Sequence, residues 1–319
     1  MDYFAGIIGQ ERAINLLTKS MDNGNISHAY LFSGPAGVGK MQVATAFAYS
    51  LIQRQDKQAK VYFSENIHPD LFIIEKLENR SLISKEQITQ ELEPWLALKP
   101  YRAQRRVAII RDAHLMSLEA ANALLKTLEE PPGYALIILI SDDDNLLETI
   151  VSRCQVVRFF PLAEKDIAEY LLNQGFEGEK ASWAAQLGQG SISRALHFAQ
   201  EDGLEQIWDT VVAIITDLAR GRKSAIFELS EKIQKAPDLS IKLMETILRD
   251  TLVAGKSRQQ GILLAPEIPE LQKLLQGKDQ GKIMQALVEI DKLRAYYRRN
   301  INSALINTSI GYQLWEALQ

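Results

Sequence analysis

Cysteine is almost absent from this chain of 319 residues. The single cysteine, Cys154, cannot form a disulfide within the chain and cannot supply a cysteine-based zinc cluster, so we expect neither feature. Long apolar runs are also missing: no stretch of about 18 apolar residues occurs, and residues 1–10 show no basic segment ahead of an apolar one. The sequence therefore predicts no membrane span and no signal peptide, and it predicts a cytoplasmic location.

An excess of positive charge is lacking as well. The formal net charge is −4 at pH 7 and the pI is about 5.7, which argues against a protein held on nucleic acid by its overall field. Any contact with DNA is expected to be local or shared with partner proteins. Hydrophobic residues are plentiful, at 46% of the chain, which is enough for two or three cores at the usual domain size of roughly 100 to 200 residues.

The first half of the chain alternates short apolar runs with helical patterns. This alternation is typical of a parallel sheet covered by helices, because strands that are buried on both faces are apolar throughout. The five expected strands lie at residues 28–32, 70–74, 106–110, 135–140 and 155–160. We therefore predict an α/β domain over residues 1–161.

After Pro161 the strand pattern disappears. Three short helical patterns, separated by turns that contain glycine, predict a small helical domain over residues 162–203. Longer helical patterns then continue to the end of the sequence, which predicts an all-helical domain over residues 204–319. The chain is thus expected to contain three domains.

A glycine-rich loop follows the first expected strand. It reads GPAGVGKM and comprises Gly34, Pro35, Ala36, Gly37, Val38, Gly39, Lys40 and Met41. The spacing fits the phosphate-binding motif G-x-x-x-x-G-K-[S/T] as far as Lys40, and a helical pattern follows, which is the context that the motif requires. Met41 stands where the motif has a Ser or Thr whose hydroxyl binds Mg²⁺. The sequence therefore predicts a degenerate nucleotide-binding loop that lacks one metal ligand.

The second metal ligand of such a site is an acid after a later strand. The nearest acid to the end of the third expected strand is Asp112, in the segment VAIIRDAHLMS. Taken alone, Asp112 fits a metal-site carboxylate as well as it fits a helix N-cap or a loop ion pair. The spacing leaves these interpretations open.

Four segments together resemble a known family. They are GPAGVGK in the glycine loop, HPDL at residues 68–71, RDAHLMSLEAANALLKTLEEPP at residues 111–132 and the SRC triplet at residues 152–154. The set is similar to the bacterial clamp-loader subunits of DNA polymerase III, members of the AAA+ superfamily, over essentially residues 1–200. The resemblance implies an α/β P-loop (AAA+) parallel-sheet domain, a small helical lid domain and an all-helical C-terminal collar domain.

The resemblance also sets a register at the metal site. Subunits of this family that hydrolyse ATP carry an Asp-Glu pair here, so that Glu would fall at Asp112 and the metal-binding Asp at Arg111. A positive group about 4 Å from a divalent cation would repel it by roughly 8 kcal/mol at an effective dielectric constant of about 20, an upper bound because Arg111 can turn away. The resemblance therefore implies a subunit that does not hydrolyse ATP, while binding of ATP or ADP through Lys40 stays open.

Arg153 in the SRC triplet is the candidate catalytic residue. In other phosphoryl-transfer systems an arginine donated by a neighbouring subunit stabilises charge on the γ-phosphate and raises the rate by about 10³ to 10⁵. The resemblance implies that Arg153 acts in this way, as an arginine finger on the ATP of an adjacent gamma/tau subunit. The alternative is a surface ion pair with Asp142, Asp143 or Asp144.

Three further positions are secondary candidates. Ser141 matches a polar sensor position of the family, although a hydroxyl at a strand end is also a common turn former. Arg194 is sensor-like but lies one residue after the family's nucleotide-sensing arginine, which would fall at Ser193, and one residue is about 100° around a helix. Lys126, on an expected amphipathic helix, is a candidate DNA contact.

The zinc module that many relatives carry has no counterpart here, because residues 53–67 contain no cysteine. We therefore predict no metal site, no zinc and no required cofactor. His68, which remains beside this region, is expected to be a loop residue that forms hydrogen bonds.

The resemblance implies partners as well. A clamp-loader subunit is a component of DNA polymerase III, a DNA-directed DNA polymerase and hence a nucleotidyltransferase. In DNA replication it works in a hetero-oligomer with gamma/tau and delta subunits, the beta sliding clamp and primer–template DNA. The competing interpretations are an ATP-hydrolysing AAA+ motor, either gamma/tau-like or a branch-migration helicase, and a small-molecule kinase. Met41 and Arg111 argue against turnover by the isolated chain.

Overall fold

The protein is described here by a computed structural model. The residues described are 3–54, 56, 58–64, 67–78, 80–143, 146–201, 203–254, 269–294, 296–297 and 302–319. Contacts within the chain divide it into two compact units. The first comprises Met1–Gly178 and Gly188–Arg194, and the second comprises Glu179–Leu187 and Ala195–Gln319.

The first unit is built on a five-stranded parallel sheet with the strand order β2-β3-β4-β1-β5. The strands are β1 (Ala29–Ser33), β2 (Leu71–Ile74), β3 (Arg106–Ile110), β4 (Ala135–Ser141) and β5 (Gln155–Arg158). β1, β3 and β4 are buried at every residue, which is why their sequences are continuous apolar runs. The predicted parallel sheet is confirmed.

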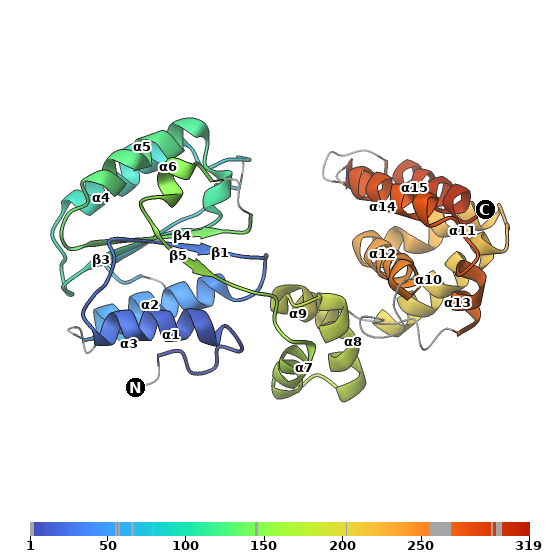
Figure 1. Ribbon diagram of the computed structural model, residues 1–319, viewed down its shortest axis with the longest axis horizontal. Helices are drawn as coiled ribbons and strands as arrows, with labels where there is room; N and C mark the ends of the chain where they lie inside the picture. The colour runs from blue at the N-terminus through green and yellow to red at the C-terminus, as the bar shows by residue number, and fades with distance from the viewer. Residues whose placement is uncertain are drawn as a thin grey trace. The chain divides into compact units, whose positions relative to one another are not determined.

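Helices cover both faces of this sheet (Figure 1). One face carries α1 (Glu11–Asp22), α2 (Lys40–Gln53) and α3 (Ala59–Ser64), and the other carries a π-helical turn (Gln87–Leu92), α4 (Glu93–Ala97), α5 (Leu118–Glu129) and α6 (Glu148–Val151). Successive residues of β1 serve the two faces in turn: Tyr30 and Phe32 lie in the core with α2, and Ala29 and Leu31 lie in the core with α5.

The glycine loop connects β1 to α2 and passes close to another segment. Gly37 has a φ of 74° and Gly39 a φ of 96°, both in the left-handed region that favours glycine. A Cβ on Gly37 would lie 2.2 Å from the Oγ of Ser191, just before α9 (Ile192–Gln200). The predicted order of strand, loop and helix around Lys40 is therefore confirmed, and the loop is held against a distant part of the chain.

The predicted lid, residues 162–203, is helical as expected. Its helices are α7 (Glu164–Asn173), α8 (Gly178–Gly188) and α9. The two compact units divide these helices between them, since α7 lies in the first unit and most of α8 lies in the second. A separate lid domain therefore stays a prediction.

The second unit is helical throughout the part of the chain that the structure describes. Its further helices are α10 (Leu204–Ala219), α11 (Ala225–Lys232), a 3₁₀ turn (Ile233–Lys235), α12 (Pro237–Ala254), α13 (Pro269–Leu275), α14 (Gln280–Arg294) and α15 (Ser303–Ala317). A Cβ on Gly311 of α15 would lie 3.0 Å from Cγ2 of Ile226, so a glycine lets α11 and α15 approach closely. None of the described helices is long and apolar enough to cross a membrane.

Candidate functional site

Lys40 is the first residue of α2, and its side chain turns back into the glycine loop. The side chain is 3% exposed, and its Nζ lies 2.7 Å from the Oδ1 of Asp142, which follows β4. The same Nζ donates to the backbone carbonyl oxygens of Gly34 and Pro35. β1 and β4 are adjacent parallel strands, so their carboxyl ends bring the loop and Asp142 together.

These three acceptors match the three N–H donors of the Lys40 ammonium group. A phosphate that approached Lys40 would have to replace the Asp142 carboxylate, which is itself a charge-assisted hydrogen-bond partner. The loop therefore keeps the backbone of a phosphate cradle, but the charge of its lysine is already paired.

The two positions that interrupt the metal site both have contacts of their own. The side chain of Met41 packs against the apolar core of the first unit. Arg111, directly after β3, has its Nη1 3.1 Å from Glu75 and its Nε 3.8 Å from the Oδ2 of Asp112. Asp112 precedes a 3₁₀ turn (Ala113–Leu115) without a side-chain capping bond, so its contact is the loop ion pair and not an N-cap. The guanidinium group of Arg111 therefore lies beside Asp112, the acid that could have bound a metal ion.

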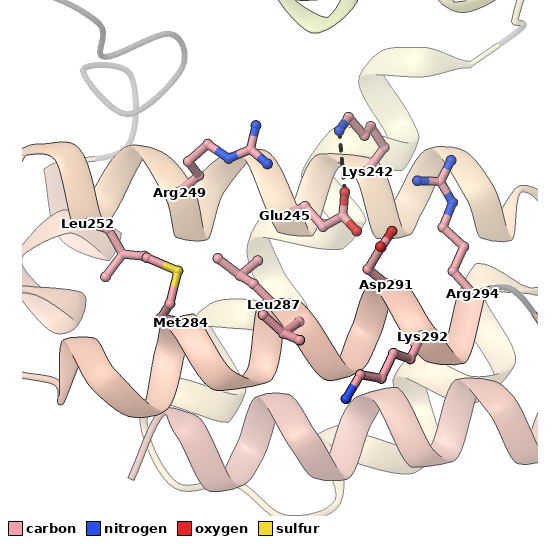
Figure 2. A pocket seen from close by; sticks show the side chains of 10 residues that line it. Lys242, Glu245, Arg249, Leu252, Met284, Leu287, Asp291, Lys292 and Arg294 are labelled. Atoms are coloured by element: carbon pink, nitrogen blue, oxygen red, sulfur yellow. Dashed lines mark hydrogen bonds and ion pairs between the residues drawn. The ribbon is translucent and has the colours of Figure 1, made fainter. Parts of the chain in front are cut away.

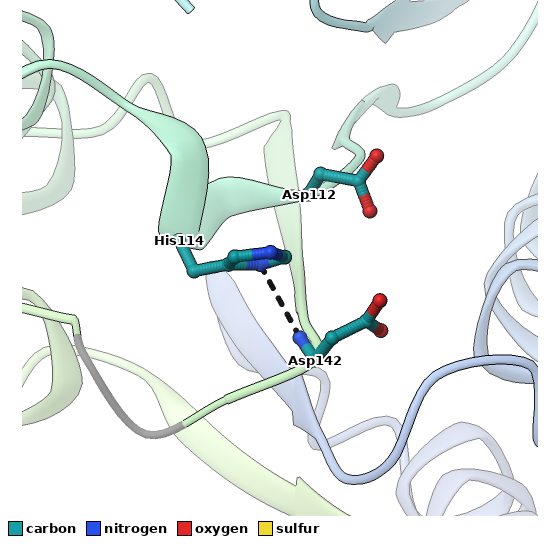
Figure 3. Close-up of side chains that lie close together, drawn as sticks. All are labelled: Asp112, His114 and Asp142. Carbon is teal, nitrogen blue, oxygen red and sulfur yellow. Dashed lines mark hydrogen bonds between the residues drawn. The ribbon is translucent and has the colours of Figure 1, made fainter. Parts of the chain in front are cut away.

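Asp112, His114 and Asp142 come close together (Figure 3). One potential ligand atom of each lies within 4.8 Å of the others. The N–H of Asp142 donates to Nδ1 of His114 at 3.3 Å, so the neutral ring carries its proton on Nε2 and has no lone pair left for a metal. The Asp142 carboxylate is also paired with Lys40. The trio is better suited to fixing the turn after β4 than to holding a cation.

The sensor-like Ser141 is committed to a turn. It ends β4, is fully buried, and its hydroxyl donates to the backbone carbonyl oxygen of Asp143. This is the local hydrogen bond of a turn-forming serine, the ordinary alternative that the sequence also allowed.

The segment around Arg194 reaches the glycine loop through a different residue. The Nη2 of Arg194 lies 3.5 Å from the carbonyl oxygen of Gln189. The backbone N–H of Ser193 donates to the carbonyl oxygen of Gly37 at 3.3 Å. The sequence did not predict this contact, although the family register had placed the sensing position at Ser193 and so contained a signal for it.

Arg153 follows α6 and lies against α5. Its Nη2 is 2.6 Å from Oε1 of Glu129, and its Nη1 donates to the carbonyl oxygen of Thr149 at 2.9 Å. The side chain is 34% exposed. The guanidinium group is therefore oriented by one carboxylate and one carbonyl while part of it faces solvent.

The ion pair of Arg153 corrects an expectation. The sequence named three aspartates as alternative partners, yet Asp142 pairs with Lys40 and Asp144 lies outside the described residues. The partner is Glu129, at the end of α5, and α5 and α6 are in contact. The three aspartates were expected because they lie near Arg153 in the sequence. The packing of α6 on α5 instead brings Glu129 next to Arg153.

Two remaining residues stand apart from the loop. Lys126 is exposed on α5, so it is accessible from solvent. Cys154 is partly buried, and burial raises the pKa of its thiol to about 12. Because the thiolate is the reactive form, Cys154 is a poor nucleophile.

An ion-pair cluster surrounds Asp56, in the segment after α2. Asp56, 5% exposed, accepts from Arg102 through Nε at 2.5 Å and Nη2 at 3.1 Å, and lies 3.3 Å from Nε2 of His68. The hydrogen bond from Arg102 is the main cause that lowers the pKa of Asp56 to about 2. Nδ1 of His68 accepts from the N–H of Asp70 at 3.1 Å, so the predicted hydrogen-bonding role of His68 is confirmed. The cluster ties the segment after α2 to β2 and to the loop before β3.

Comparison with known proteins shows which family has these features. A family model described as "DNA polymerase III, delta subunit" matches residues 9–163. Over 313 residues, which are 93% of this chain and 94% of the other, the chain is 27% identical to DNA polymerase III subunit delta' of Bacillus subtilis. The family model and this relative confirm the predicted resemblance to the clamp-loader subunits of DNA polymerase III. The parallel sheet covered by helices confirms the predicted α/β fold class of the first unit.

Two further relatives indicate which clamp-loader subunit the chain resembles. It is 36% identical over 137 residues to subunit delta' of Pseudomonas aeruginosa, covering 40% of this chain and 42% of that one. It is 33% identical over 224 residues to subunit tau/gamma of Haemophilus influenzae, covering 66% of this chain but only 33% of that one. Of these three relatives, the delta-prime subunit of Bacillus subtilis is the one matched along nearly the whole of both chains.

Proposed function

We propose that this clamp-loader subunit acts as a delta-prime subunit that does not hydrolyse ATP. In this role it helps to assemble the cytoplasmic complex that loads the beta sliding clamp onto primed DNA, with gamma/tau and delta subunits as partners. It also contributes Arg153 to the ATP of a neighbouring ATPase subunit. The full-length similarity to a delta-prime subunit supports the role, and the glycine loop supports the lack of hydrolysis.

The observation that carries this proposal is the pairing of Lys40 within the chain. A P-loop ATPase needs its lysine on the outer phosphates and a hydroxyl and an acid on Mg²⁺. Here Lys40 binds its own loop and Asp142, Met41 packs into the core, and Arg111 follows β3 where the acid is needed. A nucleotide that enters this loop has to displace Asp142 and binds without a metal ion, so we expect weak binding and no turnover.

Arg153 is suited to act on another subunit. Its side chain is about one-third exposed, and its guanidinium group pairs with the carboxylate of Glu129. A guanidinium group forms paired hydrogen bonds to phosphate oxygens as readily as to a carboxylate, so Arg153 can exchange Glu129 for a γ-phosphate. The contact with Thr149 keeps the group oriented during that exchange.

The first test is turnover by the purified chain. We expect no Mg²⁺-dependent phosphate release above the buffer background, with an active gamma/tau subunit as the positive control. Turnover by the isolated chain would favour the ATP-hydrolysing motor and overturn the proposal.

The second test replaces Arg153 in the reconstituted complex. We expect Arg153→Ala to abolish hydrolysis of the neighbouring subunit's ATP, because an arginine finger contributes about 10³ to 10⁵ in rate at a single site. Total ATPase activity should fall only by the share of that site, since the other sites continue to work, and clamp loading should fall with it. Arg153→Lys should restore little of the lost ATPase and clamp-loading activity, since lysine lacks the planar guanidinium group that forms paired hydrogen bonds to phosphate oxygens. Arg158→Ala, an exposed arginine on β5, is the matched control. Size-exclusion chromatography checks assembly, and normal loading by a correctly assembled Arg153→Ala complex would contradict the role.

A further inference from the structure

Lys40 and Arg153, the two cations that the sequence motifs assign to phosphate, are both paired with a carboxylate of this chain. Nζ of Lys40 lies 2.7 Å from Oδ1 of Asp142, and Nη2 of Arg153 lies 2.6 Å from Oε1 of Glu129. In each pair the carboxylate accepts a charge-assisted hydrogen bond from the group that binds phosphate oxygens in proteins that use these motifs. Each cation therefore has an internal anion with which a phosphate must compete.

The pair between Arg153 and Glu129 joins two helices that are separate in the sequence. Many ion pairs on helix surfaces are local: in the groove between α12 and α14 of the second unit, Lys242 pairs with Glu245, three residues along the same helix (Figure 2). Such neighbours meet wherever a helix forms. Glu129 ends α5 and Arg153 follows α6, 24 residues later, so their contact depends on how the two helices pack.

The packing of α6 on α5 does not depend on this ion pair. Ile150 of α6 is fully buried in the same apolar core as Leu124 and Leu128 of α5. Burial of an aliphatic side chain contributes more to stability than an ion pair whose side chains are 34% and 51% exposed. Apolar contacts therefore hold α6 on α5, and the ion pair determines where the guanidinium group of Arg153 lies.

Glu129 stands at a position where its own helix disfavours a negative charge. It is the last residue of α5, at the negative end of the helix dipole, and a second acid, Glu130, follows it directly. The positive charge of Arg153 offsets this effect, while its Nη1 donates to the carbonyl oxygen of Thr149 in α6. The contact with Arg153 therefore accounts for an acid that the helix itself does not favour.

We propose that Glu129 competes with the γ-phosphate of a neighbouring subunit's ATP for Arg153, and so restrains the arginine finger. This inference rests on the proposed role of Arg153. A guanidinium group pairs with phosphate as it does with a carboxylate, and a terminal phosphate carries about −1.5 to −2 charges near pH 7 against −1 for Glu129. A correctly placed γ-phosphate therefore displaces Glu129, whereas Arg153 stays with Glu129 when the phosphate is out of reach.

The restraint has a limited size, because both side chains are partly exposed. An exposed ion pair changes an equilibrium by about two- to fivefold at most. Glu129 thus lowers the rate at the neighbouring site by about this factor, since Arg153 has to leave the carboxylate each time it engages ATP. The contact with Thr149 persists during the exchange and keeps the guanidinium group oriented.

The first test uses the isolated full-length chain and does not depend on ATP. Phenylglyoxal modifies guanidinium groups, and peptide mass spectrometry follows the modification of Arg153 separately from that of the other arginines. We expect Glu129→Gln to raise the rate of modification at Arg153 by about two- to fivefold. Glu130→Gln, which changes the adjacent exposed acid, should leave the rate as in the wild type. Equal rates in Glu129→Gln and the wild type would overturn the restraint, whatever Arg153 does in the complex.

The second test measures the ATPase activity of the reconstituted complex. The part of the activity that depends on Arg153 is the part that Arg153→Ala removes. We expect Glu129→Gln to raise this part by about two- to fivefold, Glu130→Gln to leave it unchanged, and Glu129→Gln to have no effect when it is added to Arg153→Ala. Size-exclusion chromatography checks that each complex assembles.

Two outcomes of the second test separate the restraint from the role of Arg153 itself. If Arg153→Ala lowers the activity but Glu129→Gln leaves it unchanged or lowers it too, Arg153 acts as proposed and Glu129 does not restrain it. If Arg153→Ala leaves the activity of an assembled complex unchanged, the proposed role of Arg153 is wrong, and the restraint on a finger is overturned with it.

Discussion

Lys40 illustrates how a loop can keep the backbone of a phosphate-binding loop while its lysine is paired within the chain. The spacing of the glycines and Lys40 predicted the loop, because a left-handed φ and a close approach of backbone leave few alternatives to glycine. The partner of Lys40 could not be predicted in the same way. Asp142 lies far along the chain, and it reaches the loop only because β4 is the neighbour of β1 in the sheet.

Removing the Asp142 carboxylate should strengthen nucleotide binding. A hydrogen bond between charged groups contributes about 1.5 to 3 kcal/mol, and Asp142 competes with phosphate for Lys40, so Asp142→Ala should lower the Kd for ATP by about tenfold. Titration of a fluorescent ATP analogue without Mg²⁺ measures the change. Asp143→Ala is the neighbouring control, and adding Lys40→Ala to Asp142→Ala should abolish the gain. Unchanged or weaker binding in Asp142→Ala would mean that Asp142 does not compete.

The ion-pair cluster around Asp56 should make stability depend on acid pH. The pKa of Asp56 is about 2 in the folded protein, below its ordinary value, so its contribution is present above about pH 4 and is lost as the pH falls toward 2. Asp56→Asn should therefore lower the free energy of unfolding near pH 7 by on the order of 1 kcal/mol, since Arg102 is 29% exposed and water screens the pair.

Urea unfolding of Asp56→Asn and the wild type between about pH 3.5 and pH 7 measures this difference. The difference in the free energy of unfolding between the two proteins should be constant near neutrality and should become smaller below about pH 4. Asp22→Asn, an exposed aspartate at the end of α1, is the control and should show no such narrowing. A gap that stays constant down to pH 3.5 would contradict the assignment.

Among the helices and strands, those with the simplest environment were the most predictable. β1, β3 and β4 are buried on both faces, so their apolar runs mark them directly. The contact of Ser193 with Gly37 and the division of α8 and α9 between two units were not predictable, because neither leaves a local pattern. Both depend on which segments meet after folding.

The approach of the glycine loop to the segment before α9 can be tested at Gly37. Gly37→Ala combines a left-handed φ of 74° with a Cβ placed 2.2 Å from Ser191 Oγ. The strained φ costs about 1 to 2 kcal/mol and the steric conflict about 1 to 3 kcal/mol more, so the melting temperature should fall by several degrees. Gly24→Ala has a similar φ of 66° but nothing within 4 Å of its Cβ, so it isolates the strain. Equal losses in the two variants would show that the close approach contributes nothing.

At the scale of the whole molecule, the net charge and the family resemblance both indicate a protein that acts together with partner proteins. A net charge of −4 gives the isolated chain little attraction for a polyanion, and the clamp-loader family places such a chain inside a complex. Composition alone could predict the first point, and the motifs the second. For contact with DNA the sequence offers Lys126 as a candidate, and this stays a prediction, because one exposed lysine on an amphipathic helix resembles any other.

DNA binding should therefore separate the isolated chain from the assembled complex. We expect the chain alone to bind primed DNA weakly at physiological salt, and Lys126→Ala to weaken binding by the reconstituted complex equally for different DNA sequences. If Lys126 contacts one phosphate, the slope of log K against log salt should fall by about 0.9, as measured by fluorescence anisotropy over several salt concentrations. Lys19→Ala, also exposed but on α1, should leave the slope unchanged. Equal slopes for the two variants would exclude Lys126 as a phosphate contact, and tight binding by the chain alone would show that a local basic patch outweighs its net charge.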